Sequence, residues 1–143
     1  MKIHICKAVD NDFEAIYSFI NELEGQVFNR EKQAEIFHQV IQHPNNIYLV
    51  AFDEDTPIGF ISCHAQNLLH HSGLIGEIQE MFVVEKYRSF GVGKSLIENL
   101  ILESKQKGFL QLEVTSSKRR EKAHEFYLRE GFLASHFKFT LAL

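Results

Sequence analysis

Residues 76–93 read Gly-Glu-Ile-Gln-Glu-Met-Phe-Val-Val-Glu-Lys-Tyr-Arg-Ser-Phe-Gly-Val-Gly. The apolar run from Met81 to Val84 predicts a strand, and the residues that follow Gly93 have helical periodicity. A glycine-containing turn between a strand and a helix presents backbone N–H groups and the positive end of the helix dipole to an anion. We therefore expect a phosphate-bearing cofactor at this turn, with Arg88 as an additional cation.

The spacing of the glycines decides between the known phosphate-binding loops. A P-loop would need glycine at position 88, where Arg88 stands, and a dinucleotide fingerprint would need three spaced glycines and an acidic ribose partner. The pattern Arg-x-x-Gly-x-Gly after a strand instead resembles the pyrophosphate loop of the GCN5-related N-acetyltransferases, which bind acetyl-coenzyme A. The resemblance implies that acetyl-CoA contacts Met81, Phe82, Val83, Arg88, Ser89, Phe90, Gly91, Val92, Gly93, Lys94 and Tyr127.

Length and composition fit one soluble domain over residues 1–143. Apolar residues make up 45% of the chain and charged residues 24%, and no stretch approaches the roughly 20 apolar residues of a membrane span. The formal net charge of −4 argues against general nucleic-acid binding. Cys6 and Cys63 make neither a disulfide framework nor a zinc motif, and the polar N-terminus is too short for a signal peptide, so we expect a cytoplasmic protein.

Hydrophobic periodicity predicts an alternation of strands and helices along the whole chain. We expect strands at 2–8, 47–52, 58–65, 74–84 and 109–115, helices at 13–23, 29–41, 92–107 and 120–129, and one or two final strands within 132–141. This order is that of the acetyltransferase fold. It implies an α/β GNAT acyl-CoA N-acyltransferase fold, with a mixed, mostly antiparallel central sheet of six to seven strands flanked by about four helices.

Further segments support the resemblance and narrow it. Residues 126–132, Phe-Tyr-Leu-Arg-Glu-Gly-Phe, are similar to the Phe-Tyr-x-x-x-Gly-Phe signature of the family's last helix. From about Gly59 onward the chain resembles the aminoalkylphosphonate N-acetyltransferases, notably at residues 69–71, 76–80, 118–120, 123–124 and 135–137. Those enzymes transfer acetyl from acetyl-CoA to small aminoalkylphosphonates and depend on a divalent metal ion, so the resemblance implies both properties here.

Amide formation requires a base, because an alkylamine with a pKa of roughly 10 is protonated at neutral pH. Glu77 and Glu80 lie on the strand that precedes the glycine turn. Regular alternation places them on opposite faces, so that only one reaches the substrate, although a bulge would relax this rule. Glu77 occupies the position of a general base in some relatives and is slightly favoured.

The same strand and the last helix also contain candidates for two further catalytic roles, stabilisation of the thioester oxygen and protonation of the leaving thiolate. The backbone N–H of Met81 or Val83 is placed to polarise the thioester oxygen. Tyr127 is the expected general acid for the leaving thiolate, since phenol and thiol pKa values are close. An aromatic residue that only packs against its neighbours would show the same helical periodicity.

The substrate that accepts the acetyl group must also be bound by residues of the protein. Ser117, Lys118, Arg119 and Arg120 precede the last helix and are expected to bind the phosphonate, although a charge run at a helix start is often only solvated. His70 and His71, with His64, are candidates to hold a divalent ion or, for His71, the substrate. Adjacent histidines cannot both point one way from an extended chain, and surface histidines are the alternative.

The leading interpretation is therefore an acetyl-CoA-dependent N-acetyltransferase that acts on a small aminoalkylphosphonate by direct attack in a ternary complex. The same chemistry on another small amine, such as an aminoglycoside or polyamine, is the first alternative. A non-catalytic acyl-CoA-binding module is the second. The expected partners are a small-molecule amine and a second copy of the chain in a homodimer, with neither nucleic acid nor membrane.

Overall fold

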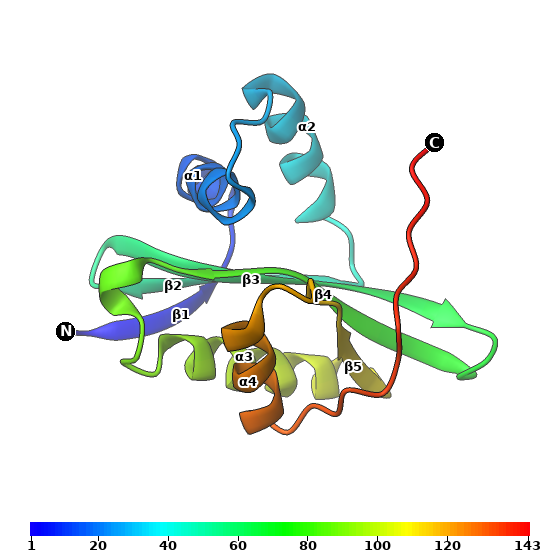
Figure 1. The fold of residues 1–143 in the computed structure, drawn as a ribbon. Helices are drawn as coiled ribbons and strands as arrows, with labels where there is room; N and C mark the ends of the chain where they lie inside the picture. Colours follow the sequence, from blue (N-terminus) through cyan, green and yellow to red (C-terminus); the bar gives the residue numbers. More distant parts are fainter.

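The computed structural model describes residues 1–143, and a five-stranded sheet separates two layers of helices (Figure 1). The elements are β1 (Ile3–Lys7), α1 (Phe13–Glu24), α2 (Arg30–Val40), β2 (Asn46–Asp53), β3 (Thr56–Leu68), β4 (Gly73–Val83), α3 (Val92–Gln106), β5 (Gln111–Val114) and α4 (Glu121–Arg129). Helices α1 and α2 cover one face of the sheet, and α3 and α4 cover the other. None of these helices combines the length and the apolar character needed to span a membrane.

The sheet has the order β1-β2-β3-β4-β5, and its first four strands are antiparallel. Strand β5 is parallel to β4 and pairs with it only from Ile75 to Ile78. Residues 79–83 of β4 therefore have no strand on that side, although β3 still pairs with them on the other. This separation of β4 from β5 leaves backbone groups of β4 open to a ligand.

Two apolar cores lie on the two faces of the sheet. The core beneath α3 consists of side chains that are almost fully buried, among them Ile61, Leu96 and Leu100. The core beneath α1 and α2 is largely aromatic and includes Phe19, Phe60 and Phe82. Burying such large side chains holds α1 and α2 on the sheet and fixes the wall of the site described below.

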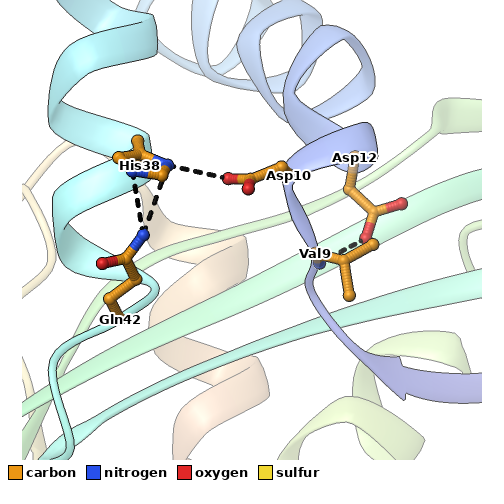
Figure 2. A network of polar contacts seen from close by, with 5 residues as sticks. All are labelled: Val9, Asp10, Asp12, His38 and Gln42. Carbon is orange, nitrogen blue, oxygen red and sulfur yellow. Dashed lines mark hydrogen bonds and ion pairs between the residues drawn. The ribbon is translucent and has the colours of Figure 1, made fainter.

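Polar contacts at the helix ends position α2 relative to α1. Asn29 caps α2 as its sequence position predicts, because its Oδ1 accepts the Lys32 N–H at 2.8 Å. At the other end of α2, His38 Nδ1 lies 3.1 Å from an Asp10 carboxylate oxygen, and Gln42 contacts the same imidazole (Figure 2). Asp10 belongs to the short 3₁₀ turn that precedes α1, so this contact joins α2 to the start of α1.

The expected C-terminal strands are absent, and the prediction of six to seven strands is wrong. Residues 133–143 form no strand and make no backbone hydrogen bonds with the sheet. Their alternating sequence suits a strand, but a strand forms only where a neighbouring strand satisfies its N–H and C=O groups. The described chain places no such neighbour beside them.

Candidate active site

A bulge in β4 changes which of its side chains share a face. Ser62 of β3 lies opposite Glu80, and the next residue, Cys63, lies opposite Ile78. Gln79 is therefore an extra residue without a partner on β3, which is the definition of a β-bulge. Because His64 lies opposite Glu77, both glutamates face the α1 and α2 side of the sheet. The opposite-face arrangement expected from regular alternation does not occur.

The two carboxylates nevertheless have different surroundings. Ser62, which is fully buried, donates its hydroxyl proton to Glu80 Oε1 and accepts the Glu80 N–H at 3.0 Å. Burial raises the pKa of Glu80, and the Ser62 hydrogen bond opposes this rise. Glu77 is instead contacted by Gln79, whose Nε2 lies 3.1 Å from its Oε1. Glu80 is thus the carboxylate that is desolvated and held in one orientation.

Glu80 lines a cavity of about 250 Å³ between α1, α2 and the sheet. Most of its lining is apolar, and its polar residues include Glu24, Tyr48 and Glu80. The Tyr48 hydroxyl lies 2.6 Å from His64 Nε2, and burial together with the nearby Glu80 charge raises the pKa of Tyr48. Burial lowers the pKa of His64, which favours the neutral imidazole as the acceptor for Tyr48. The cavity suits a small molecule that carries an amine.

One of the predicted anion-binding residues, Arg120, forms an ion pair with a residue that lines this cavity. Arg120 Nη2 lies 3.3 Å from the Leu23 carbonyl oxygen and 3.9 Å from Glu24 Oε1, which joins the start of α4 to the end of α1. Both side chains of this ion pair are 44% exposed, so the guanidinium remains accessible to a ligand. Arg120 also lies close enough to Tyr127 for its charge to oppose the burial-driven rise of that residue's pKa.

The other residues of the cationic run remain in the loop. Lys118 and Arg119 are exposed and form no salt bridge. Ser117 makes contacts within its own segment, where its carbonyl oxygen lies 2.8 Å from His124 Nε2. Arg120 is therefore the member of the run that forms an ion pair with a residue lining the cavity.

Tyr127 packs against the core beneath α3, on the face of the sheet opposite to the cavity. Its hydroxyl is 4.0 Å from Met81 Sδ, and its ring packs edge-on against Phe126 and Phe132. Burial raises the pKa of Tyr127, so the hydroxyl keeps its proton at neutral pH. This is the state that a general acid requires.

The unpaired edge of β4 supplies backbone donors near Tyr127. The Phe82 carbonyl oxygen faces β3, since a Cβ added to Gly59 would lie 2.6 Å from it. Alternation along a strand then directs the N–H groups of Met81 and Val83 away from β3, into the opening. The Val83 carbonyl is already occupied, because Arg88 Nε donates to it at 2.7 Å.

The glycine turn provides a cradle at the start of α3. Gly91 has φ +81°, a conformation that favours glycine, and no side chain caps the first N–H groups of the helix. A Cβ added to Gly93 would lie 2.9 Å from Met81 Cε, so this glycine allows α3 to approach β4 closely. Arg88 does not point into the cradle as expected, because its guanidinium lies over the Phe82 ring. Ser89, Phe90 and Lys94 are exposed around the turn.

The histidine pair does not form a metal centre. His70 and His71 lie in the turn between β3 and β4, with their rings 4.4 Å apart. No group of three or more His, Cys, Asp or Glu side chains lies close enough together to hold a metal ion. The residues present therefore do not fit a metal site held by the protein, and the expectation at His70 and His71 is not supported. Neither histidine lines the cavity that contains Glu80.

Three polar residues of this region were missed by sequence reasoning. Glu24, Tyr48 and Ser62 come from α1, β2 and β3, and no spacing in the sequence joins them. Tyr48 and Ser62 lie within the apolar central parts of their strands, which is a weak signal that a polar group is needed there. Their cross-strand pairing places both on the row that ends at Glu80.

The separated strands, the uncapped glycine turn and the adjoining cavity are the arrangement expected of an acyltransferase that takes its acyl group from a coenzyme A thioester. Residues 13–132 match the sequence model of the "Acetyltransferase (GNAT) family", and the chain belongs to this family of acetyl-CoA-dependent N-acetyltransferases.

Individual relatives agree with this assignment. The chain is 36% identical to an aminoalkylphosphonate N-acetyltransferase of Salmonella typhimurium over 95% of this chain and 88% of that protein. It is 25% identical to an uncharacterised N-acetyltransferase of Methanocaldococcus jannaschii, over 87% of this chain and 56% of that one.

Solved structures share the fold at lower identity. A transcriptional regulator from Bacillus halodurans superposes with a TM-score of 0.90 and 21% identity, over 99% of each chain. The enzyme AAC(6')-Iy, solved with a bisubstrate analogue that contains coenzyme A, superposes with a TM-score of 0.89 and 15% identity over 100% of this chain and 99% of that one. At these identities the likeness establishes the fold.

Proposed function

We propose that this protein transfers the acetyl group of acetyl-CoA to the primary amine of a small aminoalkylphosphonate, by direct attack in a ternary complex. The observation that carries the proposal is the acceptor cavity, which has the half-buried Glu80 in its wall and Arg120 ion-paired to its lining residue Glu24. The 36% identity to an aminoalkylphosphonate N-acetyltransferase supports this choice of acceptor.

Glu80 is proposed as the general base. The attacking nitrogen must lose a proton, and a desolvated carboxylate whose pKa is raised accepts one more readily than an ordinary surface carboxylate. The sequence slightly favoured Glu77, but Glu77 does not line the cavity. The geometry therefore supports Glu80 for this role.

The remaining steps use the opening between β4 and β5. The amine nitrogen attacks the thioester carbon, and the N–H of Met81 or Val83 stabilises the negative charge that develops on the carbonyl oxygen. The new C–N bond forms as the C–S bond breaks. Glu80 receives the proton of the amine, and Tyr127 donates its hydroxyl proton to the departing thiolate.

Arg120 is proposed as the counter-charge of the phosphonate. A guanidinium binds a phosphonate through paired hydrogen bonds, and its present partner Glu24 is exposed enough to be displaced. A second candidate acceptor follows from the same cavity, because Glu24, Glu80 and a mostly apolar wall also suit an amine without an anionic group. An aminoglycoside or polyamine is an example.

Acceptor assays distinguish these two proposals. Release of free thiol from acetyl-CoA would be measured with aminomethylphosphonate, 1- and 2-aminoethylphosphonate, kanamycin and spermidine, each with and without EDTA. We expect turnover of the phosphonates, and the arm with EDTA reports separately whether that turnover requires a metal ion. Turnover of kanamycin or spermidine alone would refute the phosphonate acceptor, and loss of activity with EDTA would show that a metal is required.

A matched pair of variants tests the proposed role of Arg120. Arg120→Ala should raise KM for a phosphonate far more than KM for an amine that carries no anionic group. Arg119→Ala should change neither KM value, because Arg119 is exposed in the loop and forms no salt bridge. Equal effects of the two substitutions would contradict the assignment.

A further inference from the structure

The wall of the cavity between α1, α2 and the sheet is more apolar than the simplest aminoalkylphosphonates require. Nine of the twelve residues that line the cavity are hydrophobic. They come from both helices and from the loop between them, and they include Ile20 of α1, Phe28 of the loop, and Ile36 and Val40 of α2. Aminomethylphosphonate has a single carbon atom, so it has almost no apolar surface to place against such a wall.

Hydrogen bonds to the loop between α1 and α2 hold this wall in place. The Tyr17 hydroxyl donates to the Phe28 carbonyl oxygen at 2.5 Å, and the Phe28 N–H donates to Asn21 Oδ1 at 3.0 Å. Both backbone groups of Phe28 are therefore tied to α1. The Phe13 ring packs against the rings of Tyr17 and Phe37, with centroids 5.5 and 5.8 Å apart. The cavity is thus preformed, as small-molecule sites usually are.

The proposed base fixes which part of the acceptor contacts this wall. Glu80 lines the cavity, and a carboxylate accepts a proton from a group within hydrogen-bond reach. The amine nitrogen therefore lies inside the cavity, and the carbon atom bonded to it lies there too. A substituent on this carbon contacts the apolar wall, while the phosphonate extends toward Arg120, the partner of the lining residue Glu24.

The volume and the charges of the cavity limit what this substituent can be. The cavity measures about 250 Å³, and an apolar cavity of about 150 Å³ is enough to bind benzene. Ile36 belongs to the lining and is 42% exposed, so it offers apolar surface that a ligand can cover. A carboxylate substituent would be repelled by Glu24 and Glu80. A branched alkyl or aryl group satisfies both conditions.

We propose that the acceptor is a 1-aminoalkylphosphonate whose amine-bearing carbon carries a branched alkyl or aryl group, and that this group occupies the cavity between α1 and α2. The inference rests on the proposed function and adds a selectivity to it. Covering the apolar wall stabilises the bound substrate and the transition state alike, so the selectivity is expected in KM and in kcat/KM.

A graded series of acceptors tests this selectivity. Thiol release would give kcat/KM for aminomethylphosphonate and for 1-aminoalkylphosphonates with methyl, isobutyl and benzyl substituents, each with and without a divalent metal ion. One methylene in an apolar pocket changes kcat/KM by roughly 10–200-fold, so the isobutyl compound should exceed aminomethylphosphonate by about 10²-fold or more. Isopentylamine, which is the isobutyl compound without its phosphonate, separates the contribution of the alkyl group from that of the anion.

A matched pair of variants tests the place of the substituent. Ile36→Gln puts an amide into the wall at a partly exposed position of α2, and it should lower the ratio of kcat/KM for the isobutyl compound to that for aminomethylphosphonate by about tenfold. Leu102→Gln is the control, because Leu102 is 60% exposed on α3 and does not line the cavity. It should keep the wild-type ratio, and circular dichroism verifies that both variants are folded.

The outcomes separate this inference from the proposed function. Turnover of aminomethylphosphonate that equals or exceeds turnover of the isobutyl and benzyl compounds would overturn the inference and leave the proposed function intact. A ratio that Ile36→Gln leaves unchanged would also overturn it. Turnover of isopentylamine as efficient as that of its phosphonate counterpart would refute the phosphonate acceptor and support the apolar site. Absence of turnover with every acceptor would refute the proposed function and the inference together.

Discussion

Replacing Glu80 by glutamine removes the proposed base with little change in shape. Ser62 can still donate its hydroxyl proton to the amide oxygen at this position, so the local hydrogen bond is retained. The difference between the two proteins is then the ability to accept a proton from the attacking amine.

The expected loss follows from the protonation of the acceptor. An amine with a pKa of roughly 10 is neutral in about one molecule in 10³ at pH 7, so an enzyme without a base depends on that small fraction. General base catalysis contributes about 10²–10⁴-fold, and we expect kcat/KM to fall by about 10³-fold, or about 4 kcal/mol in activation free energy.

The pH profile is the decisive assay. In the wild type, kcat/KM should fall as pH drops through the raised pKa of Glu80, and this acid limb should disappear in Glu80→Gln. Glu77→Gln is the matched control and should keep the limb. If Glu77→Gln flattens the profile while Glu80→Gln does not, the assignment is refuted.

Stability gives an independent check on the same variant. Burial raises the folded-state pKa of Glu80 above the ordinary value of 4.5, so ionisation costs stability as pH rises through this window. Glu80→Gln lacks that cost, and its Tm should equal or exceed that of the wild type at pH 7. A lower Tm would indicate that the activity loss reflects damage to the fold.

Three further substitutions test neighbouring parts of the site. Ser62→Ala removes the hydrogen bond that opposes the rise of the Glu80 pKa, so the acid limb of kcat/KM should move to higher pH; an unmoved limb would contradict this coupling. Tyr127→Phe should lower kcat by about 10²-fold or more and leave the calorimetric Kd for acetyl-CoA nearly unchanged, and full activity would exclude Tyr127 as the acid. Gly59→Ala places a Cβ 2.6 Å from the Phe82 carbonyl oxygen, and urea unfolding should show a loss of roughly 1–3 kcal/mol; an unchanged midpoint would argue against this close approach.

Much of the fold and the cofactor side of the site follows from local sequence. The helix cap at Asn29, the turn at Gly91 and the expected order of strands and helices through α4 depend on residues close together in the chain, and the structure confirms them. The predicted C-terminal strands are absent. A strand forms only beside a neighbouring strand, and the alternation of apolar and polar residues in the sequence does not show whether such a neighbour is present.

The sequence by itself determined the acetyltransferase family, the glycine cradle and the position of Tyr127 in the last helix. Each of these features is indicated by a short motif of neighbouring residues. Only the tertiary structure decided which of Glu77 and Glu80 lines the cavity, and which cation forms an ion pair with its lining residue Glu24. The bulge at Gln79 turns Glu77 and Glu80 to one face, and α1 and α2 then enclose Glu80. Arg120 and Glu24 form an ion pair although they are 96 positions apart in the chain. These outcomes depend on strand register and helix packing, which are set by contacts between residues distant in sequence.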